Sequence, residues 1–200
     1  MNRDTIHFWQ LPEYPGIEFL RAKYINHSYA PHFHRGYGIG IVEEGVEEFH
    51  YLGKDCAASG LSLITVNPNQ VHTGHGKGKI GWSTRMAYID TEYFTGLPGD
   101  NSGEVNSIPW FKEGVIYDEE LVELFKWMHL SMEKSGSRAV KDSMLENFIT
   151  YLVTHYASDS DTSGEKQFFE QKAVLRAKEY IQSHFNENLT IEEIAEHAYL

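Results

Sequence analysis

Three histidines are the residues of this chain whose type and spacing best suit chemistry. His32 and His34 flank Phe33, and His72 closes the segment Val66–His72. Side chains two residues apart on a β-strand point to the same face, so the first two imidazoles are expected to lie together. Three imidazoles can bind zinc or another divalent ion, and neutral imidazoles can hydrogen-bond to a small ligand or to one another. We expect a metal-free pocket, and these three residues are the ligands if a metal binds.

Short β-strands are predicted to carry the histidines. From Ile6 to Asp90, β-rich runs alternate with Gly, Pro and Asn, a pattern typical of an antiparallel sandwich or barrel. The Glu44-Gly45 pair between two of these runs predicts a hairpin. The strands are predicted over residues 17–25, 38–42, 47–51, 61–66 and 80–89.

The last predicted strand separates two faces by alternation. These faces consist of Trp82, Thr84, Met86 and Tyr88 on one side, and Ser83, Arg85, Ala87 and Ile89 on the other. We expect the first face to line a pocket with apolar walls and few polar groups. Arg85 is expected at the surface or paired with Asp90 or Glu92. The predicted ligand-binding residues are His32, His34, Tyr37, His72, Trp82, Thr84 and Met86.

Beyond a loop-like run at residues 96–103, the texture changes to helical. Apolar residues recur at helical spacing from Asp118, and Ser135-Gly136-Ser137 separates two such stretches, which predicts an antiparallel helical pair. The pair either covers the barrel or forms a dimer interface, since both roles need the same apolar stripe. The stripe also includes Met132, Val140 and Tyr156, and its candidate dimerisation residues are Leu121, Leu124, Phe125, Met128, Met144, Phe148 and Leu152.

A polar, acidic stretch of linker composition follows, and we assign residues 158–168 to a linker. After it, Val174, Ala177, Ile181 and Phe185 fall on one face of a helix. Thr190 with Glu193 three residues later is a capping box, which places the start of a second helix.

These last helices carry a family resemblance. The run Tyr180-Ile-x-x-His-Phe185, followed by Leu189-Thr-x-x-Glu-Ile-Ala195, resembles the first helix-turn-helix of AraC/XylS transcription regulators. The resemblance implies an α+β chain with a cupin-like antiparallel barrel at 1–116, a helical pair at 117–157, a linker, and an incomplete helix-turn-helix at 169–200. A helix-turn-helix reads DNA with its second helix, and we expect that helix beyond Leu200. By this resemblance the chain senses a small-molecule effector, forms a homodimer and contacts DNA only through the missing module.

The histidine spacing also resembles the two cupin motifs, in which a His-x-His pair, a carboxylate and a later histidine surround a metal. Here the glutamate is missing, because Gly38 and Ile39 occupy its positions, and Glu43 and Glu44 lie too far along the strand to replace it. The alternative interpretation is a metal-dependent cupin enzyme, a dioxygenase or isomerase, that uses the three histidines. Residues 67–74 and 81–90 resemble the AraC-type sensor barrel more closely, and Thr84 and Met86 match pocket positions of the arabinose-binding relative. We therefore expect no enzyme activity and no cofactor.

Composition limits the remaining possibilities. Seventeen basic against 29 acidic residues give a net charge of −12, which opposes binding to phosphates, so this chain should bind DNA poorly. No apolar run is long enough to span a bilayer, and no signal peptide precedes the first strand. The single cysteine, Cys56, agrees with a reducing compartment. We expect a cytoplasmic protein with no membrane partner.

Overall fold

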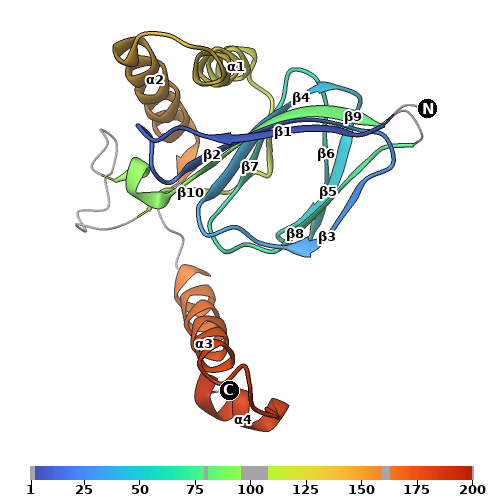
Figure 1. Ribbon diagram of the computed structural model, residues 1–200, viewed down its shortest axis with the longest axis vertical. Helices are drawn as coiled ribbons and strands as arrows, with labels where there is room; N and C mark the ends of the chain where they lie inside the picture. Colours follow the sequence, from blue (N-terminus) through green and yellow to red (C-terminus); the bar gives the residue numbers. More distant parts are fainter. Residues whose placement is uncertain (1–2, 79–80, 96–107, 159–162, 200) are drawn as a thin grey trace. The chain divides into compact units, whose positions relative to one another are not determined.

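The computed structural model describes residues 3–78, 81–95, 108–158 and 163–199, and in 163–171 only the backbone. It divides into two compact units, Met1–Asp159 and Ser160–Leu200. The predicted α+β architecture is confirmed, because the first unit is an antiparallel barrel with a helical pair and the second is helical (Figure 1). The loop predicted at 96–103 lies outside the described residues.

Two antiparallel sheets form the walls of the barrel. The larger sheet contains, in spatial order, β1 (Thr5–Gln10), β2 (Ile17–Tyr24), β9 (Trp82–Ile89), β4 (Tyr37–Glu44), β7 (Leu63–Val66) and β11 (Val115–Ile116). The smaller sheet contains β3 (Ser28–His32), β8 (His72–Gly76), β5 (Glu47–Tyr51) and β6 (Lys54–Ala58). A short pair, β10 (Trp110–Phe111) and β12 (Ala157–Ser158), ties the end of the helical pair to the barrel.

The hairpin predicted at Glu44-Gly45 is wrong, because β4 and β5 belong to different sheets. β4 is buried on both faces over its first six residues, so it takes a central place in the larger sheet instead of pairing with its successor. Gly45 turns the chain between the sheets at φ +79°, where a Cβ atom would lie 2.3 Å from the Gly81 carbonyl oxygen. The tight hairpin joins β5 to β6 instead, through Leu52 and Gly53, both at positive φ, as a two-residue turn requires.

Alternation along the strands of the larger sheet separates two hydrophobic clusters. One lies outside the barrel and includes Phe19, Ile39 and Ile89 together with the helices. The other faces the barrel interior and includes Leu20, Val66 and Trp82. A shift of one residue in register would exchange these faces, so burial on both sides fixes the register strongly.

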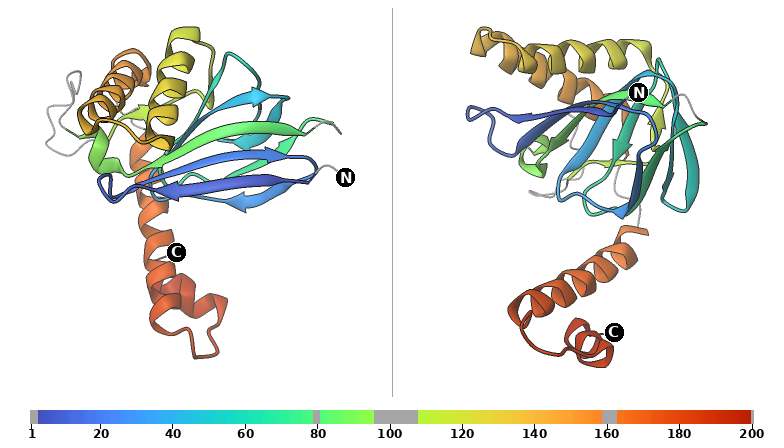
Figure 2. Two further views of the ribbon diagram at one scale, coloured as in Figure 1. Left: turned by 45° about the horizontal axis from the view of Figure 1, so that its top comes forward. Right: turned by 45° about the vertical axis from the view of Figure 1, so that its right-hand side comes forward.

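The outer cluster is covered by α1 (Glu119–Glu133) and α2 (Arg138–Tyr156), which lie together on the outer side of the larger sheet (Figures 1 and 2). Asp118 caps α1 by accepting a hydrogen bond from the Leu121 amide at 3.0 Å, and it also accepts one from the Tyr156 hydroxyl at 2.6 Å. These bonds hold the start of α1 to the end of α2. A 3-10 turn, η1 (Thr91–Phe94), adds Phe94 to the same cluster.

The stripe predicted for dimerisation packs inside this unit. Leu124 and Met144 are half-buried, and both pack against the same cluster. Val140, predicted on the stripe, is 50% exposed. The stripe therefore covers the barrel, and its central residues are not available at the surface. The central members are no more than 1% exposed: Leu121, Phe125, Met128, Met132, Phe148 and Leu152.

The second unit consists of α3 (Ser163–Ser183) and α4 (Ile191–Ala198). The capping box is present, with Thr190 and Glu193 bonded reciprocally. Part of the linker predicted at 158–168 is helical, because α3 already begins at Ser163. Glu165 and Lys166 favour a helix by their propensity. Residues 159–162 lie outside the described residues. None of the described helices is both long and apolar enough to cross a membrane.

Candidate functional site

A small cavity of about 40 Å³ lies between the two sheets of the barrel. One water needs roughly 10–15 Å³ of such volume, so the cavity has room for about three waters or a group of similar size. Both sheets contribute side chains. Its walls are formed by Leu20, Tyr24, Tyr29, His32, Gly38, Glu47, Phe49, Ile64, Val66, His72, Thr73, Trp82, Thr84, Met86 and Tyr88.

Strand β9 supplies four of these residues by alternation. Trp82, Thr84, Met86 and Tyr88 all line the cavity, as the sequence analysis placed them on one face. β9 pairs with β2 on one side and β4 on the other, so it lies in the middle of the sheet and its inner face is enclosed. The Thr84 hydroxyl donates to the Ile41 carbonyl at 2.9 Å, so it already has an acceptor within the sheet.

Three residues lie elsewhere than expected, since His34, predicted to line the pocket, is not among the lining residues. Tyr37 was expected in the pocket, but it faces the helical side of β4, where it packs on Phe94 with ring centroids 4.2 Å apart. Its hydroxyl donates to the Pro109 carbonyl at 2.5 Å. The reason is strand parity, because it is Gly38, one position on, that faces the cavity.

Arg85 was expected at the surface or beside Asp90 or Glu92, and that expectation is wrong. The residue is only 4% exposed, and its guanidinium donates to Glu43 at 2.7 Å and to Glu133 at 2.9 Å. These partners come from β4 and α1, so the ion pairs join the larger sheet to the helical pair.

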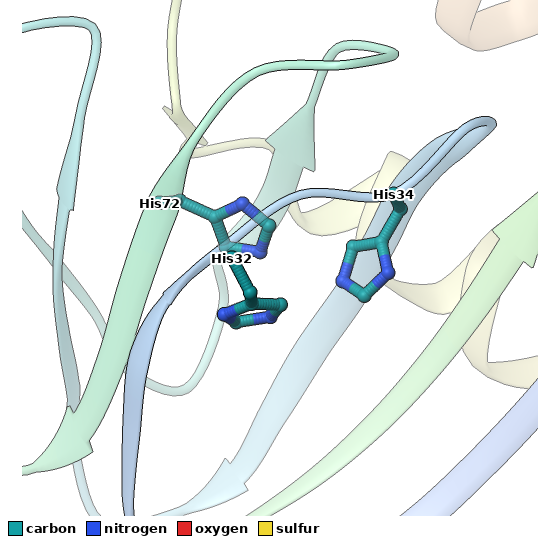
Figure 3. A group of neighbouring side chains, drawn as sticks. All are labelled: His32, His34 and His72. Carbon is teal, nitrogen blue, oxygen red and sulfur yellow. The ribbon is translucent and has the colours of Figure 1, made fainter. Parts of the chain in front are cut away.

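The three histidines do come together (Figure 3). The His32 and His72 ring centroids are 4.3 Å apart, and His34 is 5.0 Å from the first and 5.2 Å from the second. Each residue offers a ring nitrogen within 4.8 Å of the others. Burial and the neighbouring imidazoles lower the pKa of His34 to about 4, and burial lowers the pKa of His72. His34 and His72 are therefore neutral near pH 7.

Imidazole rings at this spacing fit a divalent cation. Nδ1 of His32 lies 2.8 Å from the Ala30 carbonyl and Nδ1 of His72 lies 3.1 Å from the Gln70 carbonyl. A carbonyl can only accept, so Nδ1 carries a proton in both rings and Nε2 is the atom that would bind a metal, the arrangement usual for metal-binding histidines. Among the described residues no carboxylate joins the group. The three rings could hold a metal through nitrogen ligands alone.

Among the cavity residues absent from the predicted pocket, Glu47 is the one that carries a carboxylate. It shares its face of β5 with Phe49 and Tyr51, both buried, whereas Glu48 and His50 alternate with them. This alternation was the available signal, because a carboxylate in register with two buried aromatic rings must point inward.

The buried Glu47 carboxylate has no lysine or arginine beside it in the cavity lining. Its Oε2 atom has no hydrogen-bond partner in the described part of the chain, and neither has the Trp82 indole nitrogen in the same cavity. Burial raises the pKa of Glu47 to about 7, and the nearby Trp82 N–H opposes that rise. Space for these groups depends on two glycines of β8: a Cβ on Gly74 would lie 3.0 Å from Glu47 Oε1, and one on Gly76 would lie 2.6 Å from the Trp82 ring.

A larger hollow of about 630 Å³ opens on the outside of the barrel. Its lining includes Arg21, Lys23 and Glu44, but Lys23 pairs with Glu44 at 2.9 Å and Arg21 approaches Glu133 at 3.4 Å. The exposed charges of this hollow therefore have partners, and the enclosed cavity is the better candidate for a ligand.

Comparisons with known proteins agree with the geometry. A family model described as the AraC-like ligand binding domain matches residues 14–149. The uncharacterized HTH-type transcriptional regulator YbfI of Bacillus subtilis (strain 168) is 21% identical over 187 residues, which cover 94% of this chain and 67% of that protein.

Two solved structures share the fold over most of the chain. The AraC-like transcriptional activator CuxR matches with a TM-score of 0.56 at 14% identity, covering 98% of this chain and 70% of that one. Apo ToxT from Vibrio cholerae matches with a TM-score of 0.53 at 10% identity, covering 92% and 70%. At these identities the likeness concerns the fold alone.

Proposed function

Since the chain belongs to the AraC-like ligand-binding domain family, we propose that its barrel cavity binds the small-molecule effector of a transcription regulator. The observation that carries the proposal is the enclosed cavity with two buried polar atoms that lack partners, Glu47 Oε2 and Trp82 Nε1. A native interior rarely leaves such atoms unsatisfied, and a bound ligand would satisfy them.

A physical connection from the cavity to the helical pair supports a sensing role. Leu20 and Met86 line the cavity, and their backbone carbonyls both lie 3.2 Å from His129 Nε2 on α1. The Nδ1 atom of the same ring lies 3.2 Å from the Arg85 guanidinium and accepts a hydrogen bond from it. A ligand that moves β2 or β9 would therefore also move α1. This requires that the ligand bind two arrangements of the strands and helix with different affinity.

Homodimerisation belongs to the proposal in a modified form. The buried stripe cannot supply the contact, so we assign the interface to the outer surface of the helical pair, where Trp127 on α1 is 56% exposed. A large exposed aromatic side chain is typical of an interface.

We propose DNA as a partner of the regulator, although the net charge of −12 opposes binding of these 200 residues to phosphates. The name of the Bacillus relative, an HTH-type transcriptional regulator, supports DNA as a partner. Such a partner also supports a cytoplasmic location.

The test is a thermal-shift screen of sugars, amino acids and aromatic acids with a matched pair of variants. Gly38→Ala adds a methyl group inside the cavity at ordinary contact distances, 3.5 Å or more from its neighbours, so the fold is retained and the cavity shrinks. Gly136→Ala meets no atom within 4 Å and serves as the control. A ligand at 100 times its dissociation constant stabilises by about 2.7 kcal/mol. We expect compounds that stabilise the wild type and Gly136→Ala but not Gly38→Ala. Compounds that stabilise Gly38→Ala as much as the wild type would place the effector site outside the cavity.

A metal-dependent enzyme is the second candidate, and the cluster of His32, His34 and His72 is the observation that favours it. Metal analysis of the purified protein separates the two functions. The enzyme function would be supported over the sensor function by stoichiometric iron or manganese in the wild type. His72→Ala would lose both the metal and a catalytic activity, and His75→Ala would keep both. His75 is the control because it lies on the same strand and outside the cluster.

A further inference from the structure

Two buried polar atoms of the cavity lack a partner among the described residues. Glu47 Oε2 is the acceptor left without a donor, and Trp82 Nε1 is the donor left without an acceptor. A ligand that satisfies both must bring at least one N–H or O–H donor and at least one acceptor.

The hydroxyls of the lining are partly engaged within the barrel wall. The Tyr24 and Tyr29 hydroxyls bond to each other, and Thr84 donates to the Ile41 carbonyl. Thr73 Oγ1 accepts a hydrogen bond from the His50 amide at 2.9 Å. Thr73 and one of the two tyrosines therefore keep an O–H donor, which can bind an acceptor on the ligand.

The charge of the lining has one sign. The lining contains the Glu47 carboxylate and neither lysine nor arginine. A buried carboxylate without a counter-ion is costly, and a cation beside it removes that cost, whereas an anion would add repulsion.

Aromatic rings surround the same space. The faces of Tyr and Trp rings attract cations, most strongly where water is excluded. Tyr24 and Trp82 lie with ring centroids 4.7 Å apart, and Tyr29 packs on Tyr24 at 5.7 Å. Phe49 and Tyr88 complete the aromatic part of the wall. A carboxylate together with several rings is suited to an organic ammonium group.

Size limits the ligand to a few heavy atoms within the cavity, since about 40 Å³ accommodates about three waters. Oε2 needs a donor, which favours a primary ammonium over a quaternary one. Trp82 Nε1 needs an acceptor on the same small ligand.

We infer that the effector carries a primary ammonium group, held by Glu47 and the surrounding aromatic rings, with an oxygen acceptor close to it for Trp82. The inference rests on the proposed function, because it names the chemical class of the effector for the same cavity.

Calorimetric titration with three small probes of similar size tests it: 2-aminoethanol, its neutral analogue 1,2-ethanediol, and the anion glycolate. We expect 2-aminoethanol to bind at least about tenfold more tightly than the diol and glycolate not to bind, because a charge-assisted hydrogen bond adds that much. Glu47→Gln keeps the shape of the side chain and should weaken 2-aminoethanol by about tenfold or more. Glu48→Gln, the neighbour that pairs with Lys77 at 3.0 Å, should leave it unchanged.

Equal affinity for the amine and the diol, binding of glycolate, undiminished binding of the amine to Glu47→Gln, or no binding of the amine would each overturn the inference. The Gly38→Ala variant separates this failure from failure of the proposed function. If the diol or glycolate binds and Gly38→Ala abolishes that binding, the cavity remains the effector site and only the ammonium class is wrong. If 2-aminoethanol binds Gly38→Ala as well as the wild type, the cavity is not the site and both proposals fail.

Discussion

At the scale of single residues, Glu47 and Arg85 are two buried charges in different circumstances. Arg85 has carboxylate partners on two sides and a histidine nitrogen on a third, so its charge is compensated by the fold. Glu47 Oε2 has no such partner in the described residues, and burial raises the pKa of this carboxyl group. One charge fastens two elements together, and the other is available to a ligand.

Glu47 should reduce the stability of the ligand-free protein as the pH rises. Its carboxyl has a pKa of about 7 in the fold against an ordinary 4.5, so the folded state holds more protons between these values and stability falls through that window. Above pH 7 the cost is on the order of 3 kcal/mol. Urea denaturation of Glu47→Gln should show a gain of this order at pH 8 and none at pH 4.

The groups facing Glu47 in the cavity, Tyr24, Tyr29, Tyr88 and Trp82, stay uncharged across this window, because burial raises the pKa of all three tyrosines above their ordinary 10. The control is Glu13→Gln, an exposed residue outside the barrel cavity. The same pH-dependent gain in both variants would contradict a specific effect of Glu47.

Removing Arg85 should be severe. Arg85→Met leaves Glu43 and Glu133 without their partner, and breaking a buried pair in this way costs about 3–5 kcal/mol. Glu133→Gln should cost clearly less, because Arg85 keeps Glu43 at 2.7 Å. Chemical denaturation compares the two variants, and equal losses would show that the ion pairs do not act as described.

The difference in predictability between these residues has a physical reason. Glu47 could have been placed inward from the sequence, since alternation with Phe49 and Tyr51 is a local signal. The partners of Arg85 could not, because they lie 42 and 48 residues away and meet it only when β4 and α1 pack on β9. Residues of the expected pocket face on β9 were predictable for the same local reason as Glu47.

At the scale of elements, local signals located the helices better than they located strand partners. The start of α1 at Asp118 and the capping box of α4 follow from side chains that bond within one turn. The pairing of β4 with β7 and β9 depends on burial of both its faces, which the turn residues Glu44 and Gly45 do not encode. The sequence did not predict that β3 pairs with β8, and this pairing places His32 opposite His72.

The helical pair gives the prediction at this scale. Phe148 is 0% exposed and packs on Phe125 with ring centroids 5.3 Å apart, so Phe148→Ala should cost about 3–5 kcal/mol. Trp127 is 56% exposed, and Trp127→Ala should change the stability of the fold by no more than about 0.5 kcal/mol.

Sedimentation of Trp127→Asp then tests the proposed interface. A well-folded monomer supports the outer surface of the pair as the contact, and a dimer of unchanged affinity moves the interface elsewhere. If Phe148→Ala proves as mild as Trp127→Ala, the pair does not cover the barrel as the structure indicates.

At the scale of the whole molecule, the two units differ in how much apolar surface they bury. The first contains both hydrophobic clusters. In the second, Ala173 and Ala198 are the buried hydrophobic residues among those described, while Phe185 is 82% and Ile191 is 81% exposed. Stability should therefore be distributed unevenly along the chain.

Native-state hydrogen exchange should reveal this difference. Amides of residues 172–198 are expected to exchange far faster than those of β4 and β9, because few buried contacts oppose local opening. Equal protection in both units would mean that the second unit has tertiary contacts beyond those seen here.

Effector binding in the barrel can be followed directly through the indole ¹⁵N–¹H signal of Trp82, which lies inside the cavity. The chain has four tryptophans, so four indole signals can be assigned by substitution. A stabilising compound from the screen should shift the Trp82 signal in the wild type and not in Gly38→Ala. A compound that stabilises the protein while the Trp82 signal stays in place would contradict effector binding in the barrel.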